Sequence, residues 1–260
     1  MEKIRLDVLL TERGLADSRA LAQRLVMAGQ VRVNGQVVIK PASKILATDE
    51  LSVDHGPRYV SRGGEKLEGA LVAFDLLDLQ DKVCADVGAS TGGFTDCLLQ
   101  HGARKVYAID VGYGVLHWKL RNDPRVVSME RTNARFVGSF PEAIELVTID
   151  ASFISLKVLL PVARGWFTGG GRLVALIKPQ FEAGRAEAAR GEGVIRDAAV
   201  HRRVLEDVLA AAEKEGFGIL GLARSPLLGP KGNVEFLAHL AFPGEPVESI
   251  PVLIDGVLEV

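Results

Sequence analysis

Val83-Cys84-Ala85-Asp86-Val87 leads directly into Gly88-Ala89-Ser90-Thr91-Gly92-Gly93-Phe94-Thr95, and this stretch decides the fold. The first five residues predict a short buried strand, and a helical apolar pattern follows the glycine-rich turn as far as Leu99. An open α/β sheet binds its ligands outside the carboxyl end of such a strand. The glycine spacing fits neither G-x-G-x-x-G nor G-x-x-x-x-G-K-[ST], so this turn differs from both common phosphate-binding loops.

The residue types in and after this turn indicate what it binds. Gly88, Gly92 and Gly93 are expected to let the backbone approach a ligand closely, because a Cβ would collide with it. Asp86 suits a ligand with an ammonium or sulfonium charge. An acid at the end of the next predicted strand, Asp110, can accept hydrogen bonds from both hydroxyls of an adenosine ribose, although a lone strand-end Asp is also a common turn residue. The predicted ligand contacts are Asp86, Gly88, Ala89, Ser90, Gly92, Gly93, Phe94, Asp110 and, towards adenine, Asn133.

From about residue 65 onward, short apolar strands alternate with helical stretches. The predicted strands are Val83–Val87, Lys105–Ile109, Val126–Met129, Val147–Asp150, Leu173–Ile177, Phe217–Leu222 and Asn233–Leu240. This alternation predicts a mostly parallel sheet covered by helices on both faces, and the last two strands predict an antiparallel edge hairpin. The expected fold class is α/β, a Rossmann-like seven-stranded sheet of the methyltransferase type rather than the dehydrogenase type.

A smaller unit precedes this pattern. Two short amphipathic helices are predicted, the first ending near Gly14 and the second running from an Asp17 or Ser18 cap to Gly29. Residues 31–38 alternate around Asn-Gly, which predicts a tight hairpin, and a further strand is expected at 50–53. Glycine and proline punctuate residues 55–64. We therefore expect an α+β domain at 1–58, a linker at 59–64 and the larger domain at 65–260.

The small unit resembles a known RNA-binding domain. Arg-Leu-Asp-Val-Leu-Leu at 5–10, Ser-Arg-Ala-Leu-Ala-Gln-Arg-Leu at 18–25 and Gly-Gln-Val-Arg-Val-Asn-Gly at 29–35 resemble the domain named after ribosomal protein S-four. Residues 1–58 carry nine basic and seven acidic side chains. The resemblance implies that the second helix and the hairpin present basic groups to folded RNA, although each could equally lie on a solvated face. The candidate RNA contacts are Arg5, Arg19, Arg24, Arg32 and Lys40.

Nearly the whole chain resembles the hemolysin A (TlyA) family, in which such a domain is fused to a methyltransferase domain similar to the FtsJ ribose methyltransferases. The resemblance rests on Gly64-Glu65-Lys66-Leu67, Ile149-Asp150-Ala151-Ser152-Phe153, Ile177-Lys178-Pro179-Gln180-Phe181 and Asn233-Val234-Glu235-Phe236. It implies S-adenosylmethionine as cofactor, ribosomal RNA or ribosomal subunits as partner, and 2′-O-methylation of cytidine. It also implies a catalytic set of Lys66, Asp150, Lys178 and Glu235. The loop at 90–91 has Ser-Thr where the FtsJ group has Ala-Pro.

These residue types suit the chemistry. A ribose hydroxyl is a poor nucleophile until its proton begins to leave, so a positioned base is needed. Lys178 is the expected base, because a neighbouring cation, Lys66, and desolvation both disfavour a charged amine. Asp150 and Glu235 would orient the lysines. Glu182 competes with Glu235 for this role, but Glu235 interrupts an apolar strand, where an unpaired carboxylate would be costly. Residues 182–193 are polar and glycine-punctuated, which is typical of a flap over a site.

Other features narrow the function classes. Cys84 and Cys97 have no Cys or His at metal-ligand spacing, so we expect no disulfide framework and no metal site. No apolar run approaches the ~18 residues that span a bilayer, and the amino-terminal residues do not resemble a signal peptide, so a cytoplasmic protein without a membrane partner is expected. Base methylation is disfavoured because Asp150-Ala-Ser-Phe replaces an Asp/Asn-Pro-Pro-Tyr turn. The alternatives are a membrane-active hemolysin and an RNA-binding protein with an inactive methyltransferase fold.

Overall fold

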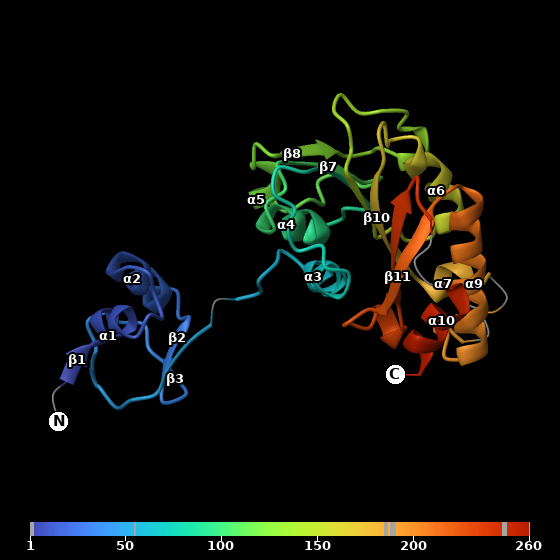
Figure 1. The fold of residues 1–260 in the computed structure, drawn as a ribbon. Helices are drawn as coiled ribbons and strands as arrows, with labels where there is room; N and C mark the ends of the chain where they lie inside the picture. Colours follow the sequence, from blue (N-terminus) through green and yellow to red (C-terminus); the bar gives the residue numbers. More distant parts are fainter. Residues whose placement is uncertain (1–2, 55, 185–186, 188–190, 246–248, 260) are drawn as a thin grey trace. The chain divides into compact units, whose positions relative to one another are not determined.

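The computed structural model describes residues 3–54, 56–184, 187, 191–245 and 249–259. The chain divides into two compact units, Met1–Arg58 and Tyr59–Val260 (Figure 1). The segment 59–64, expected to be a linker, lies inside the second unit. Tyr59 is only 2% exposed, and a Cβ at Gly64 would lie 2.2 Å from its ring. Gly64 serves this close packing and, with Gly63, begins a helix, so the expectation of a linker is corrected.

The first unit is a small α+β domain. Its elements are β1 (Lys3–Arg5), α1 (Leu6–Glu12), α2 (Arg19–Met27), β2 (Val31–Val33), β3 (Gln36–Val37), β4 (Lys44–Leu46) and β5 (Leu51–Val53). Strands β3, β2 and β5 form one sheet and β1 pairs with β4. Asn34 and Gly35 have φ of 49° and 79°, as a tight hairpin turn of this type requires. Ser18 caps α2 by accepting a hydrogen bond from Leu21 N at 3.2 Å.

The second unit alternates strands and helices. Its elements are α3 (Gly63–Ala73), β6 (Val83–Val87), α4 (Gly93–Gln100), β7 (Lys105–Ile109), α5 (Trp118–Arg121), β8 (Val126–Met129), the 3₁₀ turn η1 (Ala134–Phe136), β9 (Leu146–Ile149), α6 (Leu156–Arg164), β10 (Gly171–Ile177), α7 (Pro179–Glu182), α9 (Ala198–Lys214), β11 (Gly218–Arg224), the 3₁₀ turn η2 (Pro230–Gly232), β12 (Phe236–Phe242) and α10 (Ile250–Leu258). The first three strands have the predicted bounds, and the others are shifted by a few residues.

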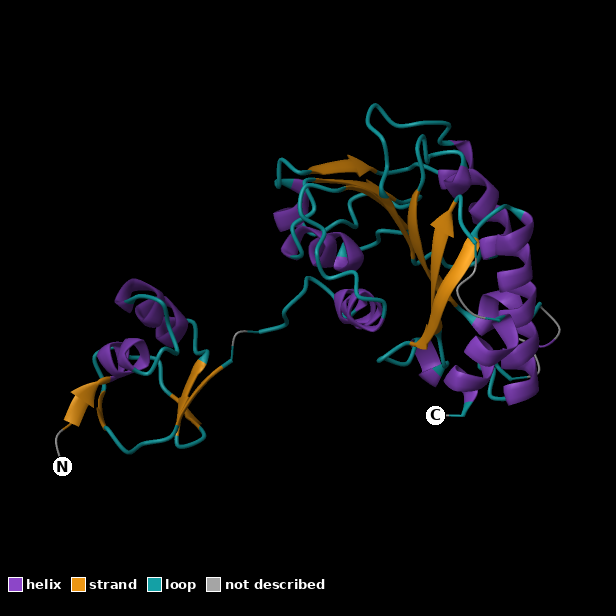
Figure 2. Ribbon diagram, in the orientation of Figure 1, coloured by secondary structure: helices purple, strands orange, loops and turns teal. Residues whose placement is uncertain are grey.

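The strands form one seven-stranded sheet in the order β11-β12-β10-β9-β6-β7-β8. Every strand except β12 runs in the same direction, because β12 pairs antiparallel with both β10 and β11. Helices cover both faces of the sheet, with α3 and α4 on one side and α6, α9 and α10 on the other (Figure 2). This is the predicted Rossmann-like methyltransferase fold with an antiparallel edge hairpin.

Successive side chains of the central strands pack alternately into two separate hydrophobic cores. On β10, Leu173, Ala175 and Ile177 pack with the cluster that contains α6 and α9, whereas Val174 and Leu176 pack with the cluster that contains α3 and α4. A strand buried on both faces reads as a continuous apolar run, which is why β10 could be predicted. The polar residues that follow such strands are therefore confined to the sheet's edge.

Candidate active site

The register of the sheet brings four chain segments to one edge. Val87 pairs with Ile149, so the loops that begin at Gly88 and Asp150 leave the sheet side by side. Ile177 pairs with Phe236 in the antiparallel ladder. Lys178 directly follows β10 and Glu235 directly precedes β12. Because the two strands are antiparallel, both residues lie at the same edge of the sheet. The order of strands reverses between β6 and β9, which is where open α/β sheets bind ligands.

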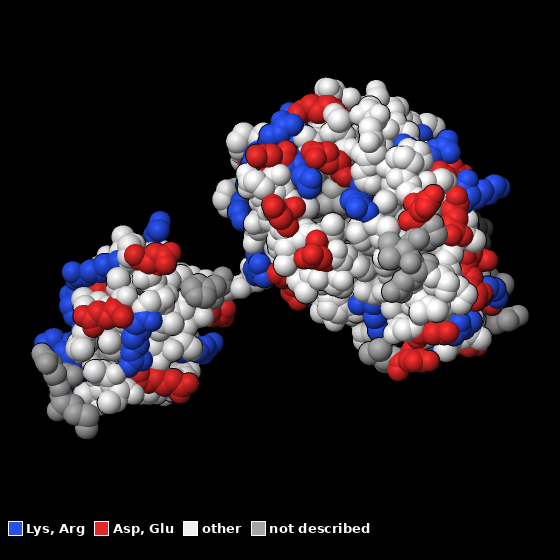
Figure 3. Space-filling view, viewed as in Figure 1, with Lys and Arg blue, Asp and Glu red and all other residues white. Residues whose placement is uncertain are grey.

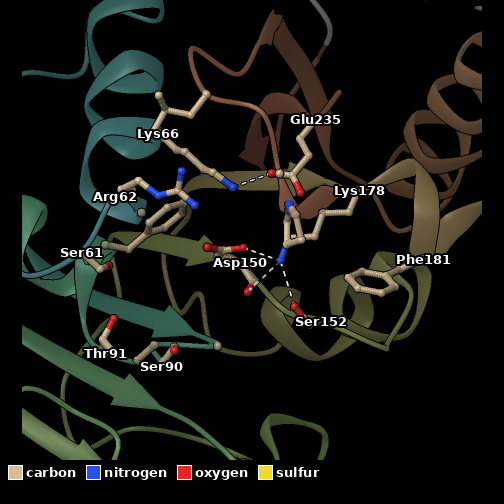
Figure 4. Close-up of a pocket in the computed structure, with 18 of the residues that line it drawn as sticks. Ser61, Arg62, Lys66, Ser90, Thr91, Asp150, Ser152, Lys178, Phe181 and Glu235 are labelled. Carbon is tan, nitrogen blue, oxygen red and sulfur yellow. Dashed lines mark hydrogen bonds and ion pairs between the residues drawn. The ribbon is translucent and has the colours of Figure 1, made fainter. Parts of the chain in front are cut away.

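All four predicted catalytic side chains meet at this edge, as two ion pairs (Figure 4). Lys66, from the first turn of α3, places Nζ 2.5 Å from Glu235 Oε2. Lys178 places Nζ 2.6 Å from Asp150 Oδ1 and donates a hydrogen bond to Ser152 Oγ at 3.1 Å. Each lysine thus has its own acid.

Glu235 rather than Glu182 is the acid that faces the lysines. The Glu235 side chain is fully buried and lies just before β12, not within the strand as the sequence pattern suggested. Glu182 turns away and caps α6, accepting hydrogen bonds from Ser155 Oγ at 2.6 Å and Leu156 N at 2.7 Å. Part of the expected flap at 182–193 lies outside the described residues.

Two adjoining cavities open onto this edge. One, of about 500 Å³, contains the four catalytic candidates together with Gly93 and Phe94. The other, of about 520 Å³, contains Asp110 and Asn133. Both are lined by Gly88, Ser90, Asp150, Ser152 and Phe153. One elongated ligand can therefore pass from the strand-end acid of β7 to the lysines. Ala89 also lines the first cavity.

The loop glycines have a packing role that the sequence reasoning did not anticipate. A Cβ at Gly92 would lie 2.2 Å from Leu120 Cδ1, and φ there is +98°. A Cβ at Gly88 would meet the Asp150 carbonyl oxygen at 2.7 Å, and one at Gly93 would meet Ser61 Oγ at 2.3 Å. All three are glycine because the loop packs tightly on the protein itself, and Gly92 does not line either cavity described here.

Asp86 lies beneath the loop rather than in the cavities. Its side chain is fully buried and accepts hydrogen bonds from Thr95 Oγ1 at 2.6 Å and Thr148 Oγ1 at 3.0 Å. Burial raises the pKa of Asp86 to about 7, against the opposing effect of the two threonine donors. Direct contact between this carboxylate and a ligand is therefore not supported. Asp86 ties the loop helix α4 to β9 instead.

Asp110 and Asn133 line the second cavity, as their predicted ligand roles require. Both side chains also have local partners. Asp110 accepts hydrogen bonds from Ser90 N at 2.8 Å and Gly112 N at 2.7 Å, and Asn133 caps η1 through Arg135 N at 3.1 Å. A carboxylate oxygen accepts more than one hydrogen bond, so Asp110 retains capacity for hydroxyl donors.

Several cavity residues were missed by the sequence reasoning. Ser61 and Arg62 line the first cavity but were assigned to a linker, and their position five and four residues before Lys66 was the available signal. Phe153 is 91% exposed, has φ of 63° and stands 4.9 Å from the Phe181 ring. Further examples in the first cavity are Thr91, Ser152, Gln180, Leu227, Leu228, Gly229 and Pro230.

The basic residues of the first unit fall into two groups. Arg5 and Arg19 bind Asp7 at 2.9 Å and 3.0 Å. Asp7 is fully buried, and the Arg5 guanidinium, with Gln23 and Arg19, holds the pKa of that carboxyl well below its usual range. These two arginines therefore have a structural role, whatever else they bind. Arg24, Arg32 and Lys40 are exposed, and Figure 3 shows basic side chains interspersed with acidic ones on the visible face of this unit.

Comparison with known proteins agrees with this organisation. The FtsJ-like methyltransferase family model matches residues 59–242 and the S4 domain model matches residues 4–51. The chain is 51% identical to "Putative rRNA methyltransferase YqxC" of Bacillus subtilis, covering 94% of this chain and 88% of that protein. It is 47% identical to the "16S/23S rRNA (cytidine-2'-O)-methyltransferase TlyA" of Mycobacterium tuberculosis, covering 92% and 90%.

A solved structure agrees over a similar span. "Putative hemolysin from Streptococcus thermophilus" superposes with a TM-score of 0.74 at 47% identity, covering 100% of this chain and 95% of that one. Among the residues described here, no helix is both long enough and apolar enough to cross a membrane.

Proposed function

Because the chain belongs to the FtsJ-like methyltransferase family and carries an S4 domain, we propose that it transfers the methyl group of S-adenosylmethionine to a ribose 2′-hydroxyl of ribosomal RNA, at cytidine. The observation that carries the proposal is the pair of lysine–carboxylate contacts, largely shielded from solvent, at the sheet edge. Relatives that share this chain's length are named for the same reaction. Such a substrate would be met in the cytoplasm, as naked RNA or as a ribosomal subunit.

The two adjoining cavities fit the cofactor. Asp110 would hold the ribose of its adenosine in the second cavity, with Asn133 nearby, and the backbone from Gly88 to Gly93 would lie along its amino-acid end. When bound, S-adenosylmethionine supplies an electrophilic methyl group on a sulfonium. The shared lining by Gly88 and Asp150 supports a reactive centre beside Lys178.

Lys178 would act on the substrate hydroxyl. Its Nζ is held by Asp150, the Asp150 carbonyl and Ser152, so its position is fixed before RNA arrives. As the hydroxyl oxygen forms its new bond to carbon, its proton becomes strongly acidic, and Lys178 in its neutral form would receive it. Lys66 would remain charged through Glu235 and provide a positive field for the oxygen that is losing its proton.

The first unit would supply much of the RNA affinity through phosphate contacts. Arg24, Arg32 and Lys40 are the candidates with the clearest freedom to bind, because they are exposed and outside the Asp7 cluster. The second unit carries arginines over aromatic rings, with Arg131 4.1 Å from the Tyr113 ring centroid. Exposed rings and guanidinium groups together are typical of surfaces that bind single-stranded RNA.

The test is methyl transfer to ribosomal subunits and to protein-free ribosomal RNA, with labelled S-adenosylmethionine and nucleoside mass spectrometry. We expect 2′-O-methylcytidine as the product. A base-methylated nucleoside would contradict the assignment of the site. RNA binding without transfer would favour an inactive methyltransferase fold, and lysis of erythrocytes without RNA methylation would favour the membrane-active alternative.

A further inference from the structure

Glu235 has hydrogen-bond partners on both carboxylate oxygens. Lys66 Nζ lies 2.5 Å from Oε2, and Gln180 Nε2 donates to Oε1 at 3.1 Å. Gln180 belongs to the short helix α7, whose first residue, Pro179, directly follows Lys178. A single turn of chain therefore carries Lys178 and also contacts the acid of the other lysine pair.

The orientation of the Gln180 amide follows from its partner. A carboxylate only accepts hydrogen bonds, so the NH₂ group must face Glu235 and the carbonyl oxygen must point elsewhere. That oxygen, Oε1, is buried and has no hydrogen-bond partner among the described residues. Buried polar atoms are nearly always satisfied in folded proteins. The Gln180 side chain directs its NH₂ group at Glu235 and leaves its carbonyl oxygen without a partner in the described part of the chain. A role in the site explains this arrangement better than a role in stability.

We propose that Gln180 is a positioning residue of this active site, whose amide keeps Glu235 ionised and directed at Lys66. The inference rests on the proposed function. Gln180 acts through Glu235 and does not need to touch the nucleotide. Without the amide donor, Oε1 of a buried carboxylate would lose its partner, which favours the protonated form. Lys66 would then lose its counter-ion in the cavity.

The other charged groups of the first cavity define how a pH profile is read. Arg62 and Lys66 approach from the start of α3, Asp150 from the end of β9 and Lys178 from the end of β10. These groups are unchanged when Gln180 is replaced. Because Lys178 is the proposed base, the acid limb of the rate profile reports on Lys178. Only the titration of the Glu235 carboxyl itself reports on the direct partner of Gln180.

The experiment compares Gln180→Met, Gln180→Glu and the full-length wild type in single-turnover methylation of ribosomal RNA between pH 5.5 and 9. Methionine keeps the side-chain length without the donor, and glutamate places a second carboxylate against Glu235. Gln100→Met is a matched control, because Gln100 Nε2 donates to the Asp96 carboxylate at the same 3.1 Å outside both cavities. Cofactor affinity is measured by calorimetry and thermal stability by the unfolding midpoint.

We expect Gln180→Met to slow transfer roughly ten- to a hundredfold at neutral pH, the rate equivalent of one hydrogen bond to a charged group. The NMR titration of the Glu235 carboxyl should move upward by about one pH unit, and further in Gln180→Glu, where two carboxylates share a proton. Gln100→Met should keep the wild-type rate and profile, and all variants should bind the cofactor alike.

A wild-type rate and profile in Gln180→Met would overturn the inference. So would a lower rate with an unmoved titration of the Glu235 carboxyl, since a merely structural role predicts that result. If Gln180→Met does not fold, Gln180→Glu decides by the same criterion. Carbon-13 NMR titration of the labelled Glu235 carboxyl, assigned with Glu235→Gln, requires no activity. An inactive wild type would thus contradict the proposed function while the NMR shift still tests Gln180.

Discussion

Replacement of Gly229 by alanine adds one methyl group against the buried acid of the site. The backbone at Gly229 has φ of −71°, which alanine adopts without strain, so the effect is confined to contacts. A Cβ there would lie 2.1 Å from Glu235 Oε1 and 2.5 Å from its Cδ. These distances are far inside van der Waals contact, so either the loop or the carboxylate must move.

The carboxylate cannot move without losing a partner. Its side chain is fully buried, and its oxygens are held by Lys66 and Gln180. Loss of one hydrogen bond to a charged group costs about 1.5–3 kcal/mol, and rupture of the ion pair would approach the ~3–5 kcal/mol of a broken buried pair. If half or more of this free energy is added to the activation barrier, Gly229→Ala slows methyl transfer roughly ten- to a hundredfold.

Single-turnover methylation of ribosomal RNA measures the rate, and calorimetry measures cofactor affinity, which should stay unchanged because Gly229 lies on the Glu235 side of the first cavity. Gly138→Ala is the matched control, since its Cβ would meet nothing within 4 Å. A Gly229→Ala enzyme with the wild-type rate, and with Glu235 still 2.5 Å from Lys66 in its structure, would refute the reasoning.

Three further predictions follow from the contacts described above. Lys178→Ala and Lys178→Arg should both abolish turnover while retaining cofactor binding, because alanine has no amine and guanidinium does not release its proton. Single-turnover activity in either variant would place the base elsewhere. Burial raises the pKa of Asp86 to about 7, so the protonated side chain stabilises the folded state at pH below ~4. This contribution to the unfolding free energy is lost as the pH rises to ~7. The unfolding free energy of wild type relative to Asp86→Asn should therefore fall over that window, by roughly 4 kcal/mol at most, and a pH-independent difference in urea titrations would contradict it. Arg24→Glu should weaken RNA binding and flatten its salt dependence without lowering the unfolding midpoint, whereas Arg19→Glu should also destabilise the first unit beside Asp7; equal stability of the two variants would argue against that structural role.

Much of the fold could be predicted because its signals are local. Strand β6 is an uninterrupted buried run before a glycine turn, and the Asn34-Gly35 hairpin needs only positive φ at two adjacent residues. The meeting of the four candidate catalytic residues could also be predicted, although through family resemblance rather than spacing, since Lys66 and Glu235 are 169 residues apart. No local pattern reports a contact of that separation.

Tertiary contacts explain what the sequence reasoning got wrong. The role of Gly92 depends on Leu120, which arrives from a later helix. Asp86 faces Thr148 on β9, so its carboxylate is turned away from the cavities. Segment 59–64 was interpreted as a linker because glycines punctuate it, yet Gly64 serves close packing against Tyr59. In each case a residue type was interpreted correctly as special, and the neighbour that makes it special was not visible in sequence.

The antiparallel strand β12 explains why the site includes residues that precede a strand. In a wholly parallel sheet, the segment before a strand lies at the edge opposite the ligand. Because β12 runs against β10, with Phe236 opposite Ile177, the segment before β12 reaches the same edge as Lys178. Glu235 and Gly229 thereby join residues that follow parallel strands. Lys66 on α3 meets Glu235 only because of this reversal, so the C-terminal hairpin contributes to the candidate active site as well as closing the sheet.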